Sequence, residues 1–366
     1  MDGDPFKEYI KESEPGKRDK GYAWHTAIGL QAVDGLTTSK YLIDTAIRNI
    51  EGDISIDEAS ELLNSYYEEN PKTDSDDRTE EADKVALRIA RILSEKAFSF
   101  TPNEYISIHK KLFTGIYNHA GKIRDYNITK KEWVLDGATV LYGSASELRA
   151  TLEYDFSEEK KFSYKNLGMN EIIHHLAVFV SRLWQIHIFG EGNTRTTAVF
   201  FIKYLRTLGF NATNGIFAEN AWYFRNSLVR ANYNNLKKGI HETTEYLELF
   251  LRNLLLDEKN ELHNRSMHIS GLLKADIQST KADIEAAKAD IEKRLANIDE
   301  SIRNKTSMRV ITLFEECGND TIFGRSMVEK ITGLKSSRAS EIISLMLDND
   351  IIEPVKGYGK GKYRFR

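Results

Sequence analysis

The feature that most limits how this chain can fold is the distribution of its prolines. The 366 residues include five prolines, at positions 5, 15, 71, 102 and 354, so the stretch from Asn103 to Glu353 contains none. Proline breaks the interior of a helix, and long uninterrupted helices are therefore allowed in this stretch. Apolar residues there recur mostly at helical spacing, for example at Ile172, Leu176 and Val180. We therefore predict a mainly α-helical protein.

Length, charge and cysteine content narrow the class of protein. A chain of 366 residues is expected to form two or three packed units. The net charge of −4 excludes a chain-wide basic field for nucleic acid. Cys317 is the single cysteine, which excludes an intrachain disulfide and fits a reducing compartment. The first 20 residues lack the apolar core of a signal peptide, and the longest apolar stretch, Leu176 to Phe189, is interrupted by polar residues. We expect a cytoplasmic protein with no membrane partner.

The composition changes near residue 270, where a heptad pattern begins. Isoleucines lie seven residues apart at positions 277, 284, 291 and 298. This narrow seam favours a connecting helix that lies on a neighbouring surface. We therefore divide the chain into an N-terminal helical region (1–100), a catalytic core (101–260), a connecting helix (261–303) and a C-terminal domain (304–366).

The C-terminal segment has the pattern of a small basic domain. From Arg303 onward the chain has 12 positively and 8 negatively charged side chains, a local excess of four positive charges. Three helical runs are followed by two short β-forming runs around a glycine-rich turn at 357–361. This order resembles a winged helix-turn-helix, in which Ser336 to Arg338 would open the recognition helix. DNA is therefore a candidate partner, with Lys335, Arg338, Lys360 and Lys362 as the residues to test.

One segment of the helical body favours β-structure. The run from Trp133 to Tyr142 is rich in β-forming residues around Asp136-Gly137, which readily adopts the positive φ angles of a two-residue turn. We predict a β-hairpin here. A lone hairpin is marginal without a partner surface, so a binding role is one interpretation and a decorative loop is the other.

The segment from Ile186 to Thr197 carries the chemistry. An apolar helix runs into His187, a turn containing Gly190 and Gly192, and then a second helix that begins near Asn193. Unpaired N–H groups at a helix start bind anions, and glycines let the backbone approach a bound group closely. Arg195 is a bidentate donor for phosphate, and Glu191 is an oxygen ligand for Mg²⁺. A histidine that titrates near neutrality can accept a proton from a hydroxyl nucleophile.

From the residues alone this segment has two readings. One is a phosphoryl- or nucleotidyl-transfer site, and the other is an ordinary glycine-rich turn between two helices. The two-histidine zinc pattern, the P-loop and the dinucleotide-binding loop are all missing from the sequence.

The segment resembles the signature of the Fic family, HxFx(D/E)GNxR. The matching positions are His187, Phe189, Glu191, Gly192, Asn193 and Arg195. The resemblance continues upstream through Gly121-Lys122-Ile123-Arg124-Asp125, which resembles the approach to the family's β-hairpin flap, and covers roughly residues 25–260. It implies a helical core that transfers AMP from ATP to a hydroxyl group of a target protein.

The resemblance also implies a role for each matching residue. His187 would deprotonate the target hydroxyl, and Glu191 would hold Mg²⁺ on the phosphates of ATP. The nucleotide-binding positions would be Gly190, Gly192, Asn193, Thr194, Arg195, Leu228 and Asn232, of which the last two would line the adenine pocket. The flap would bind the target by strand addition through Trp133, Val134 and Leu135.

The sequence departs from the family pattern in ways that bear on activity. Thr194 replaces the usual glycine before the arginine, and Ala198 replaces the second arginine. Glu51 lies in a stretch that resembles the family's inhibitory motif, although Ile47 stands at its leading position. These departures keep other functions open: a nucleotide-sensing or DNA-binding regulator with weak catalysis, or a relative that removes AMP or transfers another phosphate-containing group. We also expect a homo-oligomer.

Overall fold

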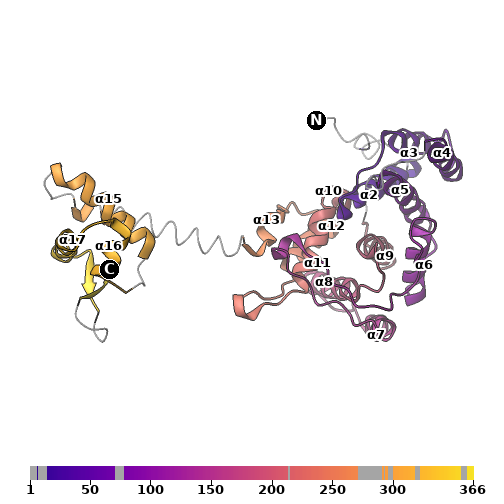
Figure 1. Cartoon of the computed structure of the whole chain (residues 1–366). Helices are drawn as coiled ribbons and strands as arrows, with labels where there is room; N and C mark the ends of the chain where they lie inside the picture. The colour runs from indigo at the N-terminus through magenta and orange to yellow at the C-terminus, as the bar shows by residue number, and fades with distance from the viewer. Residues whose placement is uncertain are drawn as a thin grey trace. The chain divides into compact units, whose positions relative to one another are not determined.

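The computed structural model describes residue 6 and residues 15–70, 78–212, 215–270, 291, 293–295, 300–317, 322–355 and 361–366. The chain divides into two compact units, Met1–Gly271 and Leu272–Arg366, and each is described by itself. The described residues are mostly helical, which confirms the predicted fold class (Figure 1).

Helices form nearly all of the regular structure in the first unit. The α-helices are α2 (Pro15–Gly29), α3 (Lys40–Glu51), α4 (Ile56–Glu69), α5 (Thr79–Ser94), α6 (Pro102–Phe113), α7 (Leu148–Lys161), α8 (Met169–Ile186), α9 (Asn193–Thr207), α10 (Ile216–Glu219), α11 (Ala221–Ala231), α12 (Glu245–Leu256) and α13 (Asn264–Met267). The short 3₁₀ helices among the described residues of this unit are η1 (Leu30–Asp34), η2 (Trp133–Leu135) and η3 (Leu236–Lys238).

Local sequence signals set several helix ends. Ser39 and Thr101 accept hydrogen bonds from backbone N–H groups in the first turns of α3 and α6, and Pro102 stands at the first position of α6. Ser55 and Glu58 form a capping box at the start of α4. These caps pair N–H groups that a helix start otherwise leaves unpaired.

Helix α9 lies at the centre of the first unit. Every residue from Asn193 to Leu205 is buried. Helices α5, α6 and α8 and the 3₁₀ helix η1 contact it, and Figure 1 shows α9 inside a ring of helices. A helix that is enclosed on all sides needs apolar residues around its whole circumference, which Val199, Phe200, Phe201 and Ile202 provide. The loop that precedes α9 is therefore held on a rigid base.

The predicted β-hairpin over Trp133–Tyr142 is wrong. Asp136 and Gly137 do have positive φ angles, 56° and 81°, and the Ala138 N–H donates to Leu135 O at 3.0 Å, as a two-residue turn requires. The flanks do not pair as strands, because residues 133–135 coil into η2. Val134 and Leu135 are consecutive and both buried, whereas a hairpin would place them on opposite faces.

The second unit has its own helices, sheet and core. Its helices are α15 (Glu300–Cys317), α16 (Arg325–Thr332) and α17 (Ser336–Asp348), and its strands are β1 (Phe323–Gly324), β2 (Ile352–Pro354) and β3 (Lys362–Phe365). The strands form an antiparallel sheet in the order β1-β3-β2, with Ile352 opposite Phe365. Apolar residues from these elements pack into a cluster separate from that of the first unit. The winged-helix assignment and the domain boundaries stay predictions.

Part of the predicted connecting helix lies outside the described residues. Of the heptad isoleucines, only Ile291 is described, and it is buried in the core of the second unit. Lys360 and most of the predicted glycine-rich turn are also outside the described ranges. Among the helices in those ranges, none combines the length and the hydropathy that a membrane span needs.

Candidate active site

The predicted chemical segment forms the turn between α8 and α9, here called the anion loop (residues 187–193). His187 ends α8 with φ 51°, a left-handed conformation that turns the chain away from the helix axis. Gly192 precedes α9 with φ 76°, and a Cβ atom there would lie 2.4 Å from the ring of Phe113, so only glycine fits. The Asn193 side chain accepts from the Phe189 N–H at 3.0 Å and donates to its carbonyl at 2.8 Å. Asn193 thus closes the loop rather than facing a ligand.

The ring of His187 is enclosed by aromatic side chains. The residue is only 3% exposed, and its ring lies 4.4 Å from that of Tyr142 and 5.2 Å from that of Trp184, centroid to centroid. Burial first, and then the positive charge of Lys130, hold the pKa of His187 well below its ordinary value. The imidazole is therefore neutral near pH 7, as a proton acceptor must be.

Arg124, from the predicted upstream stretch, fixes the start of the loop. It is buried, and its guanidinium donates to the carbonyls of Ile186, His187, Tyr126 and Gly143. These bonds tie the end of α8 to the segment that follows η2. Arg124 is a positioning residue, because its donors are used by backbone carbonyls.

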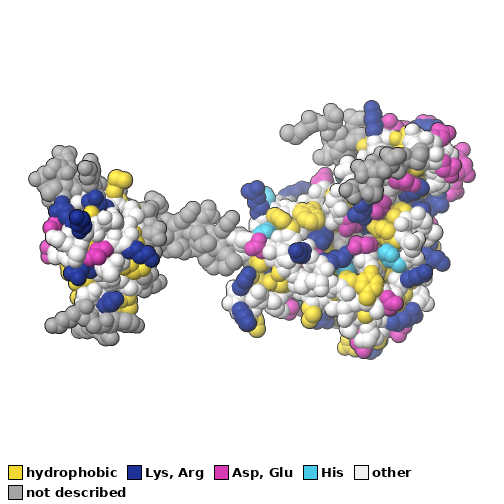
Figure 2. Space-filling view, in the orientation of Figure 1, with side chains coloured by type: hydrophobic (Ala, Val, Ile, Leu, Met, Phe, Trp, Pro, Cys, Tyr) yellow, Lys and Arg dark blue, Asp and Glu magenta, His cyan; other side chains and the backbone are white. Residues whose placement is uncertain are grey.

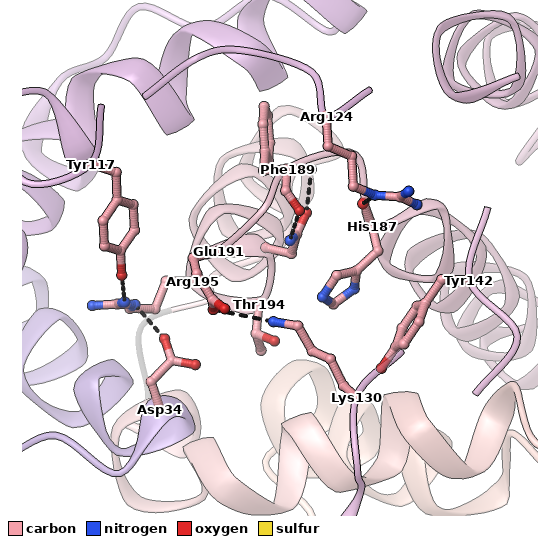
Figure 3. Close-up of polar contacts among 12 residues, drawn as sticks. Asp34, Tyr117, Arg124, Lys130, Tyr142, His187, Phe189, Glu191, Thr194 and Arg195 are labelled. Carbon is pink, nitrogen blue, oxygen red and sulfur yellow. Dashed lines mark hydrogen bonds and ion pairs between the residues drawn. The ribbon is translucent and has the colours of Figure 1, made fainter. Parts of the chain in front are cut away.

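Glu191 is exposed at the turn and pairs with a lysine. Lys130 Nζ lies 3.1 Å from Glu191 Oε2. Figure 3 marks this ion pair with a dashed line. No group of three or more possible metal ligands occurs within the ranges that the structure describes. A Mg²⁺ ion bound through one carboxylate and substrate phosphates needs no such group, so Glu191 fits this role once Lys130 moves off that oxygen.

Arg195 is fully buried and is bound by the N-terminal helices. Its Nε lies 2.8 Å from Asp34 Oδ2, and its Nη2 lies 2.7 Å from Glu81 Oε1. Gln31 and Tyr117 accept further hydrogen bonds from it, at 3.0 Å and 3.2 Å. Two carboxylates therefore compensate the charge that was predicted to bind phosphate. Figure 3 shows Asp34 and Tyr117 on either side of the guanidinium.

The other predicted nucleotide-binding residues are dispersed. Thr194 is buried, and its hydroxyl accepts from Trp184 Nε1 at 3.0 Å. Leu228 lies in the core, whereas Asn232 lines a cavity of about 730 Å³ between α8, α11 and the segment that leads into α12. Asn232 donates to Ser181 O and Leu228 O, so its amide is already engaged. Gly190 is close to Tyr126 and His119, whose atoms a Cβ at residue 190 would contact.

Two predicted placements need correction. Val134 and Leu135 are packed in the core, so only Trp133 of the three flap residues is exposed. Glu51 is not brought to the anion loop: it ends α3 on the surface and pairs with Lys17 at 2.7 Å. The buried face of α3 carries Asn49 and Ile50, which turns the next residue away from the core. The carboxylates that reach Arg195 are Asp34 and Glu81.

Several residues around the loop could not be predicted from the sequence. His109 stacks on Phe189 with ring centroids 3.7 Å apart, accepts from the Gly121 N–H through Nδ1, and donates through Nε2 to Glu191 O. Burial lowers the pKa of His109 to about 4, so it stays neutral and acts as a structural support. Of the residues around the loop that the motif does not include, only Arg124 could be found from the sequence, because it lies in the stretch 121–125 that resembles the approach to the family's flap. Residues of the N-terminal helices and Lys130 lie too far away in sequence for any spacing to link them to the loop.

Comparison with known proteins identifies the segment. Residues 99–205 match the Fic/DOC family. A solved structure of a Fic family protein from Desulfovibrio desulfuricans G20 is 12% identical, with a TM-score of 0.37, over 97% of this chain and 97% of that chain. No curated protein matches the chain. Fic proteins are typically transferases that move a nucleotide-derived group to a target. Residues 99–205 of this chain are therefore a domain of the Fic/DOC family.

Proposed function

We propose that this protein transfers AMP from ATP to a hydroxyl side chain of a target protein, with His187 as general base. The observation that carries this proposal is the arrangement of the anion loop within the family domain. A neutral imidazole ends α8, and the loop from Ile188 to Gly192 then leads into the start of α9, whose first N–H groups have no partner within the helix.

In the proposed reaction His187 takes the proton of the target hydroxyl. The hydroxyl oxygen then bonds to the α-phosphorus of ATP, and the bond from that phosphorus to the bridging oxygen breaks, releasing pyrophosphate. Glu191 would hold Mg²⁺, which neutralises phosphate charge when bound. The first turn of α9 would contribute backbone N–H groups and the positive end of the helix dipole.

The exposed part of the segment from 133 to 142 is the proposed target contact. Leu141 is 84% exposed and Trp133 is 45% exposed, and the Leu141 carbonyl accepts from Gln185, two residues before His187. A target segment laid on these side chains would pass close to the base. Leu141→Asp should reduce transfer to a protein acceptor while leaving ATP affinity unchanged. Leu236→Asp is the matched control, because Leu236 is 74% exposed on η3.

A regulator with weak catalysis is the second candidate. The observation that favours it is the state of Arg195, which is buried between two carboxylates, together with Ala198 at the position of the second arginine. Such a protein would bind ATP and turn it over slowly. The basic second unit would then carry the output, through DNA or a protein partner.

One labelling experiment tests the proposal. The purified chain is incubated with Mg²⁺ and ATP that is labelled either at the α-phosphate or at the γ-phosphate, and modified protein is mapped by mass spectrometry. AMP transfer predicts label from the α-phosphate alone. Label from the γ-phosphate alone would instead indicate phosphate transfer. ATP binding without either label would favour the regulator.

A further inference from the structure

The anion loop lacks a free arginine among its expected phosphate ligands. Arg195 is fully buried, and its guanidinium is held by Asp34 and Glu81. Ala198 is buried in α9 and offers no charge. A nucleoside triphosphate carries several negative charges, so a site that binds it needs compensating cations. The described contacts point to another source of positive charge.

Three cations act on His187, and they differ in what binds them. The positive charges that lower the pKa of His187, after burial, belong to Lys130, Arg225 and Arg124. Arg124 donates to backbone carbonyls, and Arg225 pairs at 2.7 Å with the fully buried Glu132. Lys130 instead pairs with Glu191, an exposed carboxylate on the loop itself.

Lys130 is held in this position by a well-anchored segment. Its N–H donates to Thr139 Oγ1 at 3.3 Å, and the Glu132 N–H donates to Ala138 O at 2.9 Å. Glu132 also accepts from the Tyr142 hydroxyl. The backbone is therefore fixed, while the ammonium group is partly exposed and can exchange Glu191 for another anion.

We propose that Lys130 is a phosphate-binding residue of the nucleotide site and supplies the positive charge that Arg195 and Ala198 do not. The inference rests on the proposed function, because it takes the ligand to be a nucleoside triphosphate. Glu191 would hold Mg²⁺ on the phosphates, and the ammonium group of Lys130, which pairs with that carboxylate here, would then be available to bind the phosphates. Figure 3 shows the Lys130 side chain extending to Glu191 on the side of the loop where His187 lies.

The test measures binding rather than turnover. ATP and inorganic tripolyphosphate are each titrated into the full chain with Mg²⁺ by calorimetry, for the wild type, Lys130→Met, Lys130→Arg and Lys131→Met. Lys131 is the matched control, because it is the adjacent lysine and is exposed. A hydrogen bond to a charged group predicts roughly 10- to 100-fold weaker binding of both ligands by Lys130→Met, with most affinity kept by Lys130→Arg. Lys131→Met should stay within about twofold of the wild type.

Each outcome is decisive. Equal affinities of Lys130→Met and Lys131→Met would overturn the inference and leave the proposed function standing. Binding that depends on Lys130 without any AMP transfer would support the inference and reject the proposed function. A wild-type chain that binds neither ligand would reject both. Thermal melting of each variant, followed by circular dichroism, checks that the fold is retained.

Discussion

At the scale of single residues, His187 combines a left-handed backbone with a buried neutral ring. Asparagine tolerates this backbone better than alanine does, so His187→Asn removes the base with the least distortion of the turn. We expect transfer to fall by roughly 10²–10⁴-fold while ATP affinity changes little. The transfer rate and calorimetric binding check this. A variant as active as the wild type would exclude His187 as the base.

The pH dependence of transfer follows from the same residue. A lowered pKa means that His187 keeps its neutral, proton-accepting form as the pH falls below its ordinary value of about 6.5. The rate should therefore stay level from pH 7 to about pH 6. Lys130→Met removes a positive charge beside the ring, which raises the pKa of His187 and moves the acid limb of the profile to higher pH. A wild-type acid limb centred near pH 6.5 would contradict this.

Gly192 makes a separate prediction. An alanine there would bring Cβ to 2.4 Å from the Phe113 ring in a left-handed conformation. Gly209→Ala is the matched control, since Gly209 also has a positive φ, 88°, but a Cβ there meets nothing within 4 Å. Both variants should lose about 1–2 kcal/mol of unfolding free energy from the backbone, and Gly192→Ala about 1–3 kcal/mol more from the clash. Urea unfolding measures the difference. Equal losses of unfolding free energy in the two variants would show that the loop moves away from the Phe113 ring at no cost in stability.

The motif predicted the residues of the loop better than it predicted what each one does. His187 and Gly192 act through local backbone geometry, which the spacing of histidine and glycines indicates. The roles of Thr194 and Arg195 depend on Trp184, Asp34 and Glu81. Those contacts are set by how distant helices pack, and no local pattern encodes them.

At the scale of elements, α5 and η1 hold the arginine of α9. Burial alone would raise the pKa of Glu81, but hydrogen bonds from Tyr117 and Arg195 lower it. Glu81 therefore contributes stability that is present above its unfolded pKa of about 4.3 and is lost as the pH falls through its folded pKa. The N-terminal helices are thus stabilised by their contacts with Arg195, which is the side chain that a phosphate site would use.

Glu81→Gln tests this contact. It should cost about 2–3 kcal/mol of unfolding free energy at pH 7, because Arg195 keeps Asp34 but loses a charged partner. Its difference from the wild type should shrink below about pH 4. Glu80→Gln is the control on the same turn, since Glu80 forms a more exposed pair with Lys84. Chemical unfolding at several pH values measures both. A pH-independent difference would mean that the loss comes from packing rather than charge.

The segment from 133 to 142 shows where element prediction fails. The Asp136-Gly137 turn was predicted correctly, because positive φ angles are a local property of these residues. The strands were not, because Val134 and Leu135 are both drawn into the core and Glu132 is anchored by Arg225 and Tyr142. Tertiary packing therefore determines the conformation of the residues that flank the turn, whereas Asp136 and Gly137 determine the turn itself.

At the scale of the whole molecule, the two units have separate hydrophobic cores. The mainly helical class could be predicted from the proline-free stretch between Asn103 and Glu353 and from the helical spacing of its apolar residues, since both extend over most of the chain. The excess of positive charge over residues 303–366, within the second unit, was also visible in the sequence. Fewer of these positive charges are free to bind DNA than the charge count suggested. Arg338 pairs with Glu341, and Arg364 and Arg366 pair with Glu353.

If the second unit binds DNA, Lys335 and Lys362 should carry the contact. Lys335 precedes α17 as its N-cap, and Lys362 begins β3, at the positions expected for a recognition helix and a wing. Each phosphate contact adds nearly one unit to the slope of log affinity against log salt, so Lys335→Ala/Lys362→Ala should flatten that slope by about two units.

The measurement is a titration of the full chain with random duplex DNA at low and moderate salt. Arg364→Ala/Arg366→Ala is the matched control: it removes the same number of positive charges, but from side chains already paired with Glu353. Its slope should change less than that of the lysine variant, because a guanidinium bound to a carboxylate contributes little free charge to DNA. No binding at low salt would exclude the DNA role, and equal slopes for the two variants would exclude these lysines. A protein partner would then be the remaining candidate for the output of the second unit.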